Sequence, residues 1–259
     1  MRTAIETPST HVTGALNFRD LAGVRRGVVF RSGELSQLTE ADFLTLESLG
    51  VGCVFDLRTD GERAAAPTVW SRPVIHAISV GFDRTEDPST VLQTIMTSGV
   101  EPEHAMAAMQ TVTARIAIEG AAEIGQVLLA IASGNEPAII HCTAGKDRTG
   151  IVSAFLQTLL GVPEETVYED YLRSNDTVPA EIARRRVMAA MAPSMSPVVS
   201  RMPPESIRIL MSADRSFLDS AFAAVHSEYG SFDVYVSAGL KLSSADVEAL
   251  RKRLLESAR

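Results

Sequence analysis

Cysteine, aromatic residues and long apolar runs are all scarce in this chain of 259 residues. Cys53 and Cys142 are its only cysteines, which excludes a disulfide framework and suits a reducing compartment. Cys53 lies in an apolar run and is interpreted as a small buried side chain, with a redox partnership with Cys142 as the alternative. No apolar run has the length of a transmembrane helix, and the N-terminus lacks the pattern of a cleaved secretory signal. We expect a cytoplasmic protein without stable membrane insertion.

Metal-ligand spacing is also missing. His11, His76, His104 and His226 show no such spacing with one another or with cysteine, so we expect no metal and no cofactor. The net charge of -8 disfavours a nucleic-acid-binding function, because that function needs clustered basic surface. Internal repeats and low-complexity tracts are absent from the sequence, and nothing in it specifies the oligomeric state.

The composition, with 46% hydrophobic and 22% charged residues, is that of an ordinary globular protein. We predict a single domain over 1–259 with an α/β fold, in which a small, mostly parallel central sheet is flanked by helices. Residues 177–259 are expected to form a helical extension. Residues 81–112 are interrupted by glycine and proline, so we expect an insertion with little regular structure or two short helices, able to act as a lid.

The pattern of apolar residues predicts the individual elements. Strands are expected at 27–30, 51–57, 74–80 and 138–141. Helices are expected at 39–49, 114–132, 148–160, 163–173, 179–191, 204–211, 215–229, 232–238 and 244–256. Thr39 and Ser243 open capping-box patterns at the starts of two of these helices.

The most informative segment runs from Ala138 to Gly150 and reads AIIHCTAGKDRTG. An apolar strand enters a glycine-containing turn and then a helix, so the backbone N–H groups of the turn converge above the helix N-terminus. Such a point attracts an oxyanion. The helix N-terminus, Lys146 and Arg148 would favour the thiolate of Cys142, which is the nucleophilic form. The segment therefore predicts a phosphate-binding nucleophile.

The rest of the loop is expected to bind the phosphoryl group. The substrate oxygens would contact the residues of the turn, which are Thr143, Ala144, Gly145 and Lys146. The planar fork of Arg148 matches two phosphoryl oxygens, so it would bind the substrate and stabilise charge in the transition state.

Neighbouring side chains are expected to support the loop. The His141 imidazole would order the loop backbone, and the Thr149 hydroxyl is able to hydrogen-bond the sulfur of Cys142. Charged and amide groups in the block Asp170–Asp176 would hold the loop through hydrogen bonds.

His-Cys, five residues, Arg and Thr, as found from His141 to Thr149, is the signature of the cysteine-dependent protein tyrosine phosphatase superfamily, which this chain resembles. The likeness is to a bacterial branch with dual-specificity and lipid phosphatase-like members. It extends in matching order to four further blocks: Asn17–Leu21, Phe30–Leu35, Asp56–Arg58 and Asp170–Asp176.

The resemblance implies an α/β phosphatase fold, a phosphocysteine intermediate, no metal, and activity on phosphotyrosine with possible turnover of phosphoserine, phosphothreonine and phosphoinositides. In that family the block containing Asn17, Arg19 and Asp20 supports the active-site side of the sheet. A member of the branch is exported, so export without a cleaved signal peptide stays open as an alternative to the cytoplasm.

The proton donor for the leaving oxygen has two candidates. Asp147 in the loop is the leading one, because the loop is similar to that of the myotubularin lipid phosphatases, where the corresponding aspartate has this role. Asp56, at the end of a predicted strand, is the alternative. Asp147 could instead be a structural partner of Arg58, and Asp56 a hydrogen-bonding brace at the strand end.

We therefore predict a metal-independent phosphomonoesterase that acts on phosphotyrosine proteins with relaxed specificity. A phosphoinositide phosphatase is the nearest alternative, because the extra charge of Lys146 suits a second phosphate; a solvent-facing lysine that lowers the thiol pKa would explain it equally well. A sulfurtransferase and a phosphate-recognition module without turnover are the remaining alternatives. The expected partners are phosphoprotein or phosphoinositide substrates.

Overall fold

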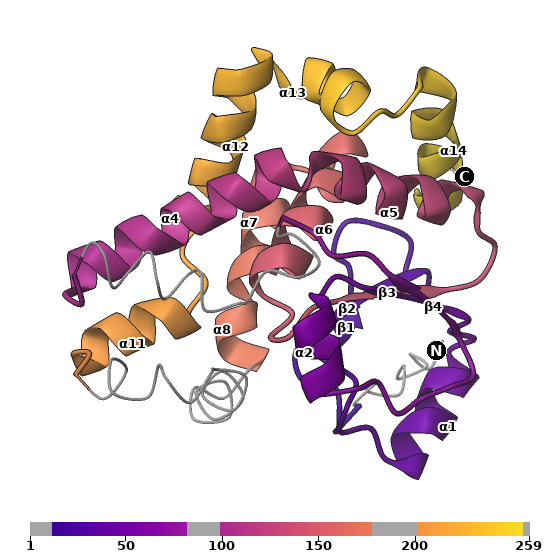
Figure 1. Cartoon of the computed structure of the whole chain (residues 1–259). Coiled ribbons are helices and arrows are strands. Elements are labelled where there is room, and N and C mark those ends of the chain that lie inside the picture. Colours follow the sequence, from indigo (N-terminus) through magenta and orange to yellow (C-terminus); the bar gives the residue numbers. More distant parts are fainter. Residues whose placement is uncertain (1–11, 82–98, 178–200, 256–259) are drawn as a thin grey trace, which may run out of the picture.

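A five-stranded sheet lies at the centre of the computed structural model, which describes residues 12–81, 99–177 and 201–255 (Figure 1). The strand order is β1-β2-β5-β3-β4, and only β1 runs antiparallel to its neighbour. The predicted mostly parallel sheet is therefore confirmed. The strands are β1 (Arg19–Asp20), β2 (Val29–Ser32), β3 (Cys53–Asp56), β4 (Val74–Ala77) and β5 (Ala138–His141).

Helices make up most of the rest of the described chain. Those before the loop that follows β5 are α1 (Glu40–Ser48), α2 (Asp60–Ala65), α4 (Pro102–Glu119) and α5 (Ala121–Ser133). Those after it are α6 (Asp147–Leu159), α7 (Glu164–Leu172), α8 (Ser174–Thr177), α11 (Pro204–Met211), α12 (Arg215–Tyr229), α13 (Phe232–Val234), the π-helix η2 (Tyr235–Gly239) and α14 (Ser244–Leu254). Both predicted capping boxes are present, at the starts of α1 and α14.

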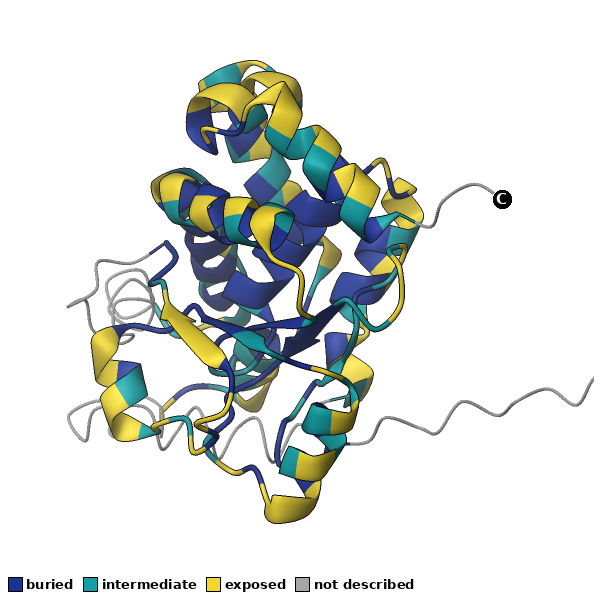
Figure 2. Ribbon diagram, turned by 90° about the vertical axis from the view of Figure 1, so that its right-hand side faces the viewer, coloured by how far each residue is buried: buried dark blue, intermediate teal, exposed yellow. Residues whose placement is uncertain are grey.

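The two faces of the sheet pack against different cores, and the strands alternate accordingly. On β5, Ala138 and Ile140 belong to the main hydrophobic cluster, whereas Ile139 belongs to a second, smaller one. On β3, Phe55 belongs to the main cluster and its neighbour Val54 to the smaller one. Because side chains of a strand alternate between faces, this period of two places α4, α5, α6 and α7 on one face and α1 on the other. Buried residues fill the interior between these layers (Figure 2).

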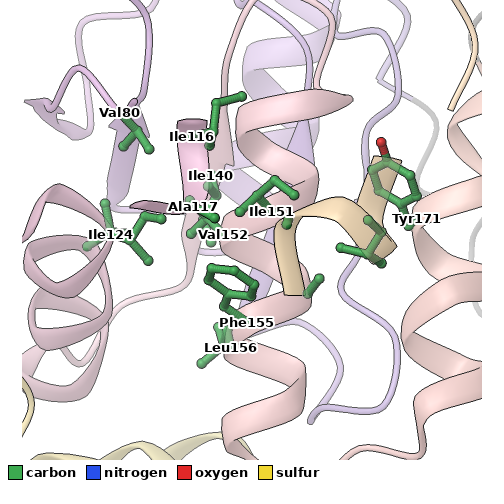
Figure 3. Close-up of a cluster of buried hydrophobic side chains, with 14 of the residues drawn as sticks. Val80, Ile116, Ala117, Ile124, Ile140, Ile151, Val152, Phe155, Leu156 and Tyr171 are labelled. Atoms are coloured by element: carbon green, nitrogen blue, oxygen red, sulfur yellow. The ribbon is translucent and has the colours of Figure 1, made fainter. Parts of the chain in front are cut away.

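Helix α6, which follows the loop, is anchored in the main cluster. Figure 3 shows Ile140 of β5 close to Ile151 and Val152 of α6, with Phe155 and Leu156 further along the same helix. All five side chains are almost fully buried. Since the strand before the loop and the helix after it share one core, the ends of the loop are fixed relative to each other.

Helix α4 differs from the prediction. Residues 81–112 were expected to have little regular structure or two short helices, but α4 already begins at Pro102 and buries Ala105, Met109 and Val112 in the main core. Proline is tolerated in the first turn of a helix, so Pro102 starts α4 instead of breaking it. Residues 82–98, the remainder of the predicted lid, lie outside the described residues.

The predicted helix 114–132 is in fact two helices separated by Gly120. A side chain at Gly120 would place its Cβ 2.6 Å from the Ile116 carbonyl oxygen and 2.7 Å from the Gly81 nitrogen. Within the described residues no single helix is long and apolar enough to cross a membrane; α4 and α5 pass that test only as a pair bent by 62°, and both are core helices.

The described part of the C-terminal extension, from residue 201, packs onto the helices of the α/β core. Helix α12 packs against α4, and α14 packs against α5; Figure 1 shows α12 and α14 at the same end of the molecule as α4 and α5. On α14, Arg253 donates to the Ile131 carbonyl at the end of α5, and Arg251 donates to the Leu159 carbonyl at the end of α6. Cations at helix C-termini are favourable, so these contacts fasten the last helix to the core. The predicted helix 179–191 lies outside the described residues.

Cys53 and Cys142 lie at opposite ends of the sheet. Cys53 is level with Ala138 at the start of β5, whereas Cys142 comes four residues later, a distance of about 13 Å along the strand. Both thiols are free. Cys53 is only partly buried, in contrast to the prediction, but this burial raises its pKa to about 11, so little of it is thiolate at neutral pH. The alternative of a redox partnership between the two cysteines is therefore wrong.

Candidate active site

The ends of β3 and β5 meet at the carboxyl edge of the sheet, where α/β proteins place their functional loops. Asp56 and His141 are paired across the two strands, and the Leu57 nitrogen donates to the His141 carbonyl. The next residue, Cys142, is buried and begins the loop, and Arg148 is the second residue of α6. The structure thus has the predicted order of strand, loop and helix.

Gly145 allows the loop to turn tightly against β2. Its φ of 69° lies in the left-handed region, and a Cβ there would come within 2.3 Å of the Ser32 carbonyl oxygen. Its own carbonyl oxygen accepts hydrogen bonds from Asn17 Nδ2 at 2.8 Å and from a terminal nitrogen of Arg31 at 3.0 Å. These contacts fix the back of the loop against β2 and the segment before β1.

Asp170 joins the two arginines behind the loop. Its carboxylate accepts from Arg19 Nε at 3.1 Å and from Arg31 Nη1 at 2.7 Å. Burial opposes ionisation of Asp170, but the two guanidinium groups outweigh it and lower its pKa. Of the family block, Asn17 and Arg19 belong to this network. Asp20 does not, because its carboxylate accepts from the Gly27 nitrogen in the turn before β2.

The guanidinium of Arg148 is held by Glu62 of α2. Its terminal nitrogens donate to the two oxygens of the Glu62 carboxylate at 2.6 and 2.7 Å, and Glu62 also accepts from the Thr143 hydroxyl. Burial alone would raise the pKa of Glu62, but Arg148 and the hydrogen bonds outweigh it and lower the pKa to about 2. Burial alone would lower the pKa of Arg148, yet Glu62 raises it.

A second cluster of charged side chains is formed by Arg58, Asp56 and Glu34. Arg58 donates to both oxygens of Asp56, at 2.9 and 2.7 Å, and reaches Glu34 at 3.4 Å. The buried His141 lies between the Cys142 carbonyl oxygen, 3.3 Å from Nδ1, and Asp56, 3.6 Å from Nε2. Burial lowers the pKa of His141 and its effect exceeds that of Asp56, so the imidazole is neutral at pH 7.

Asp147 and Lys146 lie at the start of α6. Asp147 Oδ1 is 3.4 Å from the Lys146 ammonium and has no hydrogen bond from the described residues. Lys146 itself donates to the carbonyl oxygens of Leu210 and Ser212 at 2.7 and 2.9 Å, where α11 ends. It is buried, so the alternative of a solvent-facing lysine is wrong. The proposed pairing of Asp147 with Arg58 is not seen in the described structure, because Arg58 is paired with other carboxylates.

Thr149 is buried, and its hydroxyl has no hydrogen-bond partner among the described residues. The expected hydrogen bond to the Cys142 sulfur is therefore not formed in this structure. Of the turn residues predicted to bind the substrate, Thr143 and Ala144 are partly exposed, whereas Gly145 and Lys146 are buried.

Three side chains of the site were not predicted individually: Arg31, Glu34 and Glu62. The backbone nitrogen of Glu34 donates to the Thr143 carbonyl at 3.1 Å, and its carboxylate accepts from Arg58 at 3.4 Å. For Glu62 a signal existed, because Thr59 and Glu62 have the spacing of a capping box directly after β3. That pattern predicts a helix start at the carboxyl edge of the sheet, where an arginine of the next loop can reach its carboxylate.

Among the residues that the structure describes, no group of three or more His, Cys, Asp and Glu side chains is arranged to hold a metal ion. The loop N–H groups, the N-terminus of α6 and the guanidinium of Arg148 are groups of the kind that bind anions. A thiol and a fixed guanidinium on one such loop, in a mostly parallel α/β sheet, are characteristic of the protein tyrosine phosphatase class.

Comparison with known proteins agrees with this class. The chain belongs to the tyrosine phosphatase family, whose model matches residues 10–256. It is 29% identical to the triple specificity protein phosphatase PtpB of Mycobacterium tuberculosis, over 93% of this chain and 97% of that protein. It is 28% identical to a putative tyrosine-protein phosphatase of Cupriavidus necator, over 92% of this chain and 85% of that protein. A tyrosine-protein phosphatase of Nostoc commune is also 28% identical, over 86% and 73%.

Proposed function

We propose that this tyrosine phosphatase hydrolyses phosphomonoesters in two steps through Cys142, without a metal. In the first step the thiolate sulfur attacks phosphorus, the ester P–O bond breaks, and the leaving oxygen takes a proton. In the second step water attacks phosphorus and gives a proton to the acid that was used in the first step, the S–P bond breaks to restore the thiolate, and inorganic phosphate leaves. The observation that carries this proposal is the strand–loop–helix segment with Cys142 at one end of the loop and Arg148 at the other.

The charge of the transferring group would be stabilised by the loop and by Arg148. Phosphoryl transfer spreads negative charge over three equatorial oxygens, so its main requirement is fixed donors around them. The bonds to Gly145 from Asn17 and Arg31 fix the loop backbone, and the ion pair with Glu62 fixes Arg148. The donors are therefore oriented before the substrate arrives.

We assign the proton-donor role to Asp147. Asp56 is 1% exposed and both its oxygens are bound to Arg58. Burial raises the pKa of Asp56, but the charge and hydrogen bonds of Arg58 oppose it; the net shift is downward, so the group is ionised at neutral pH. Asp147 is partly exposed at the loop, and among the described residues its ion partner is Lys146 at 3.4 Å, with no arginine bound to both of its oxygens. Asp56 is better explained as a brace that holds Arg58 and His141.

Replacing Asp147 by asparagine is expected to remove the basic limb of the kcat/KM profile against pH, because a general acid loses activity as it deprotonates. Turnover of an alkyl phosphate should fall by about 100-fold or more, and that of an activated aryl phosphate by about 10-fold or less, since a good leaving group needs little protonation. Asp56→Asn serves as the comparison. If Asp56→Asn alone produced this pattern, the assignment to Asp147 would be wrong.

Phosphotyrosine proteins are the proposed main substrates, with phosphoserine, phosphothreonine and phosphoinositides as a further range. The breadth is supported by the similarity to a phosphatase described as triple specificity. The extra charge of Lys146, in contrast, is engaged by two backbone carbonyls of the C-terminal extension. A phosphoinositide with a second phosphate would have to displace those contacts, so the geometry favours the phosphotyrosine monoester.

A substrate panel tests this proposal. Initial rates would be measured with a phosphotyrosine peptide, the matching phosphoserine and phosphothreonine peptides, and soluble phosphoinositides, with Cys142→Ser as the blank. We expect the highest kcat/KM with phosphotyrosine. A higher value with phosphoinositides would support the lipid phosphatase alternative, and equal phosphate release by the blank would exclude the cysteine mechanism.

A further inference from the structure

Glu62 contacts both ends of the phosphate-binding loop. Thr143 directly follows Cys142 in the sequence. One carboxylate oxygen of Glu62 accepts from the Thr143 hydroxyl and from one terminal nitrogen of Arg148. The other accepts from the second terminal nitrogen of Arg148. Glu62 comes from α2, separated from Arg148 by 86 positions in the sequence. It is 7% exposed, so these contacts form in a nearly water-free environment.

The helix cap of α2 accounts for only part of this arrangement. In the capping box the Thr59 nitrogen donates to Glu62 Oε2 at 2.9 Å, and the Glu62 nitrogen donates to the Thr59 hydroxyl at 3.3 Å. A cap needs one carboxylate oxygen and works equally well on an exposed helix end, as Asp246 of α14 shows. The bidentate pairing of Glu62 with Arg148 requires in addition that the carboxylate face the loop.

The charge of Glu62 persists at all pH values at which a phosphatase would work, because its pKa is lowered to about 2. Two consequences follow from a fixed negative charge at this position. A bidentate carboxylate fixes the plane of the guanidinium, which determines where its donors meet the phosphoryl oxygens. The same charge opposes the positive field of the loop and so weakens its attraction for a free dianion.

We propose that Glu62 is a positioning residue of the phosphoryl-transfer site: it orients Arg148 and Thr143 for the transition state and limits the affinity of the loop for phosphate. This inference rests on the proposed function, because it assumes that the loop binds the phosphoryl group. Glu62 acts through Arg148 and Thr143 and does not itself contact the reacting atoms. The presence of Glu62 is therefore expected to raise kcat and to lower the affinity of the loop for free phosphate.

The test is Glu62→Gln, which keeps the size of the side chain but removes its charge and one of its two acceptor oxygens. We expect kcat with an aryl phosphate to fall by about 10-fold to 100-fold, because a misoriented donor stabilises the transition state poorly. The inhibition constant of inorganic phosphate should fall by at least about threefold, since a charge opposing the anion has been removed. Unfolding and the folded fraction would be followed by circular dichroism.

Two control variants on the same helix turn separate positioning from folding. Asp60→Asn removes an acid that pairs with Arg63 at the surface, and it should leave kcat and the phosphate inhibition constant unchanged. Thr59→Ala removes the other half of the capping box, so it should lower the melting temperature while kcat per folded molecule stays within about twofold. A cap-only role for Glu62 predicts that Glu62→Gln behaves like Thr59→Ala.

The outcomes also separate this inference from the proposed function. If Glu62→Gln has wild-type kcat and phosphate affinity per folded molecule while Cys142→Ser is inactive, the positioning role is refuted and the cysteine mechanism stands. If kcat falls but phosphate binds more weakly, the charge-limiting part is refuted. If Cys142→Ser keeps its turnover, the proposed function itself fails.

Discussion

Replacing Cys142 by serine is expected to lower kcat by about 10⁴-fold or more on every substrate, because the hydroxyl has no accessible anionic form to attack phosphorus. The change replaces sulfur by oxygen in a side chain that is 3% exposed, so the loop and its supporting contacts should remain in place. Steady-state release of phosphate, measured with wild-type and variant protein at equal concentration, gives the ratio. A variant with kcat within about tenfold of the wild type would contradict the role of the thiol.

The same variant should still bind its substrate. The groups expected to donate hydrogen bonds to the substrate are the loop backbone and Arg148, and the change alters neither of them. Arg148 is held by Glu62, which does not depend on the sulfur. Titration calorimetry with a phosphotyrosine peptide should give a dissociation constant close to the KM of the wild type. Loss of binding together with loss of turnover would point to a collapsed loop instead of a missing nucleophile.

Arg148→Lys should lower kcat by about 10³-fold, the second largest effect that we expect. Lysine preserves the charge, but its ammonium is a point donor that cannot pair with both Glu62 oxygens and two phosphoryl oxygens in one plane. Single-turnover rates with an aryl phosphate measure the chemical step directly.

A matched control is Arg115→Lys on α4, where the arginine pairs with Glu119 at the surface. That exchange should leave kcat unchanged, because an exposed ion pair contributes little to stability and lies outside the site. If Arg148→Lys kept kcat within about fivefold of the wild type, charge alone would suffice and the fork geometry would be irrelevant.

The parts of the fold that sequence predicted are those specified by local patterns. The apolar run of β5 and the helices α11 and α12 have the predicted bounds, because their ends are marked by glycine, proline or capping residues. The start of α4 was missed because Pro102 has two meanings: it ends helices in general but opens this one. The short strand β1 has two residues, too few for a periodic signal.

The residues of the site also fall into those that a local pattern predicts and those that only the tertiary fold brings together. Cys142 and Arg148 are linked by a short segment with a recognisable pattern, whereas Glu62 reaches Arg148 only through the tertiary fold. Asp170 was recognised as part of a loop-supporting block, but its partners Arg19 and Arg31 are more than a hundred residues away. Pairing of charges that lie far apart in the sequence depends on how the elements are arranged in space, and local sequence patterns do not reveal that arrangement.

Lys146 illustrates the limit of reasoning from a motif. Its position in the loop predicts contact with the substrate, but its ammonium is instead bound to the Leu210 and Ser212 carbonyl oxygens. Asn175 also holds this turn, exchanging hydrogen bonds with Ala213 in both directions. The loop is thereby connected to the C-terminal extension, which the local sequence around residue 146 gives no means of foreseeing.

The central claim is that the phosphoryl group is transferred to the sulfur of Cys142. It is tested most directly by acid quenching of the wild-type enzyme during turnover of an aryl phosphate, followed by mass spectrometry of its peptides. The account predicts a phosphoryl group on the peptide that contains Cys142, appearing before the steady state and absent from Cys142→Ser. A phosphoryl group on any other residue, or unmodified enzyme at every quench time while product accumulates, would contradict it.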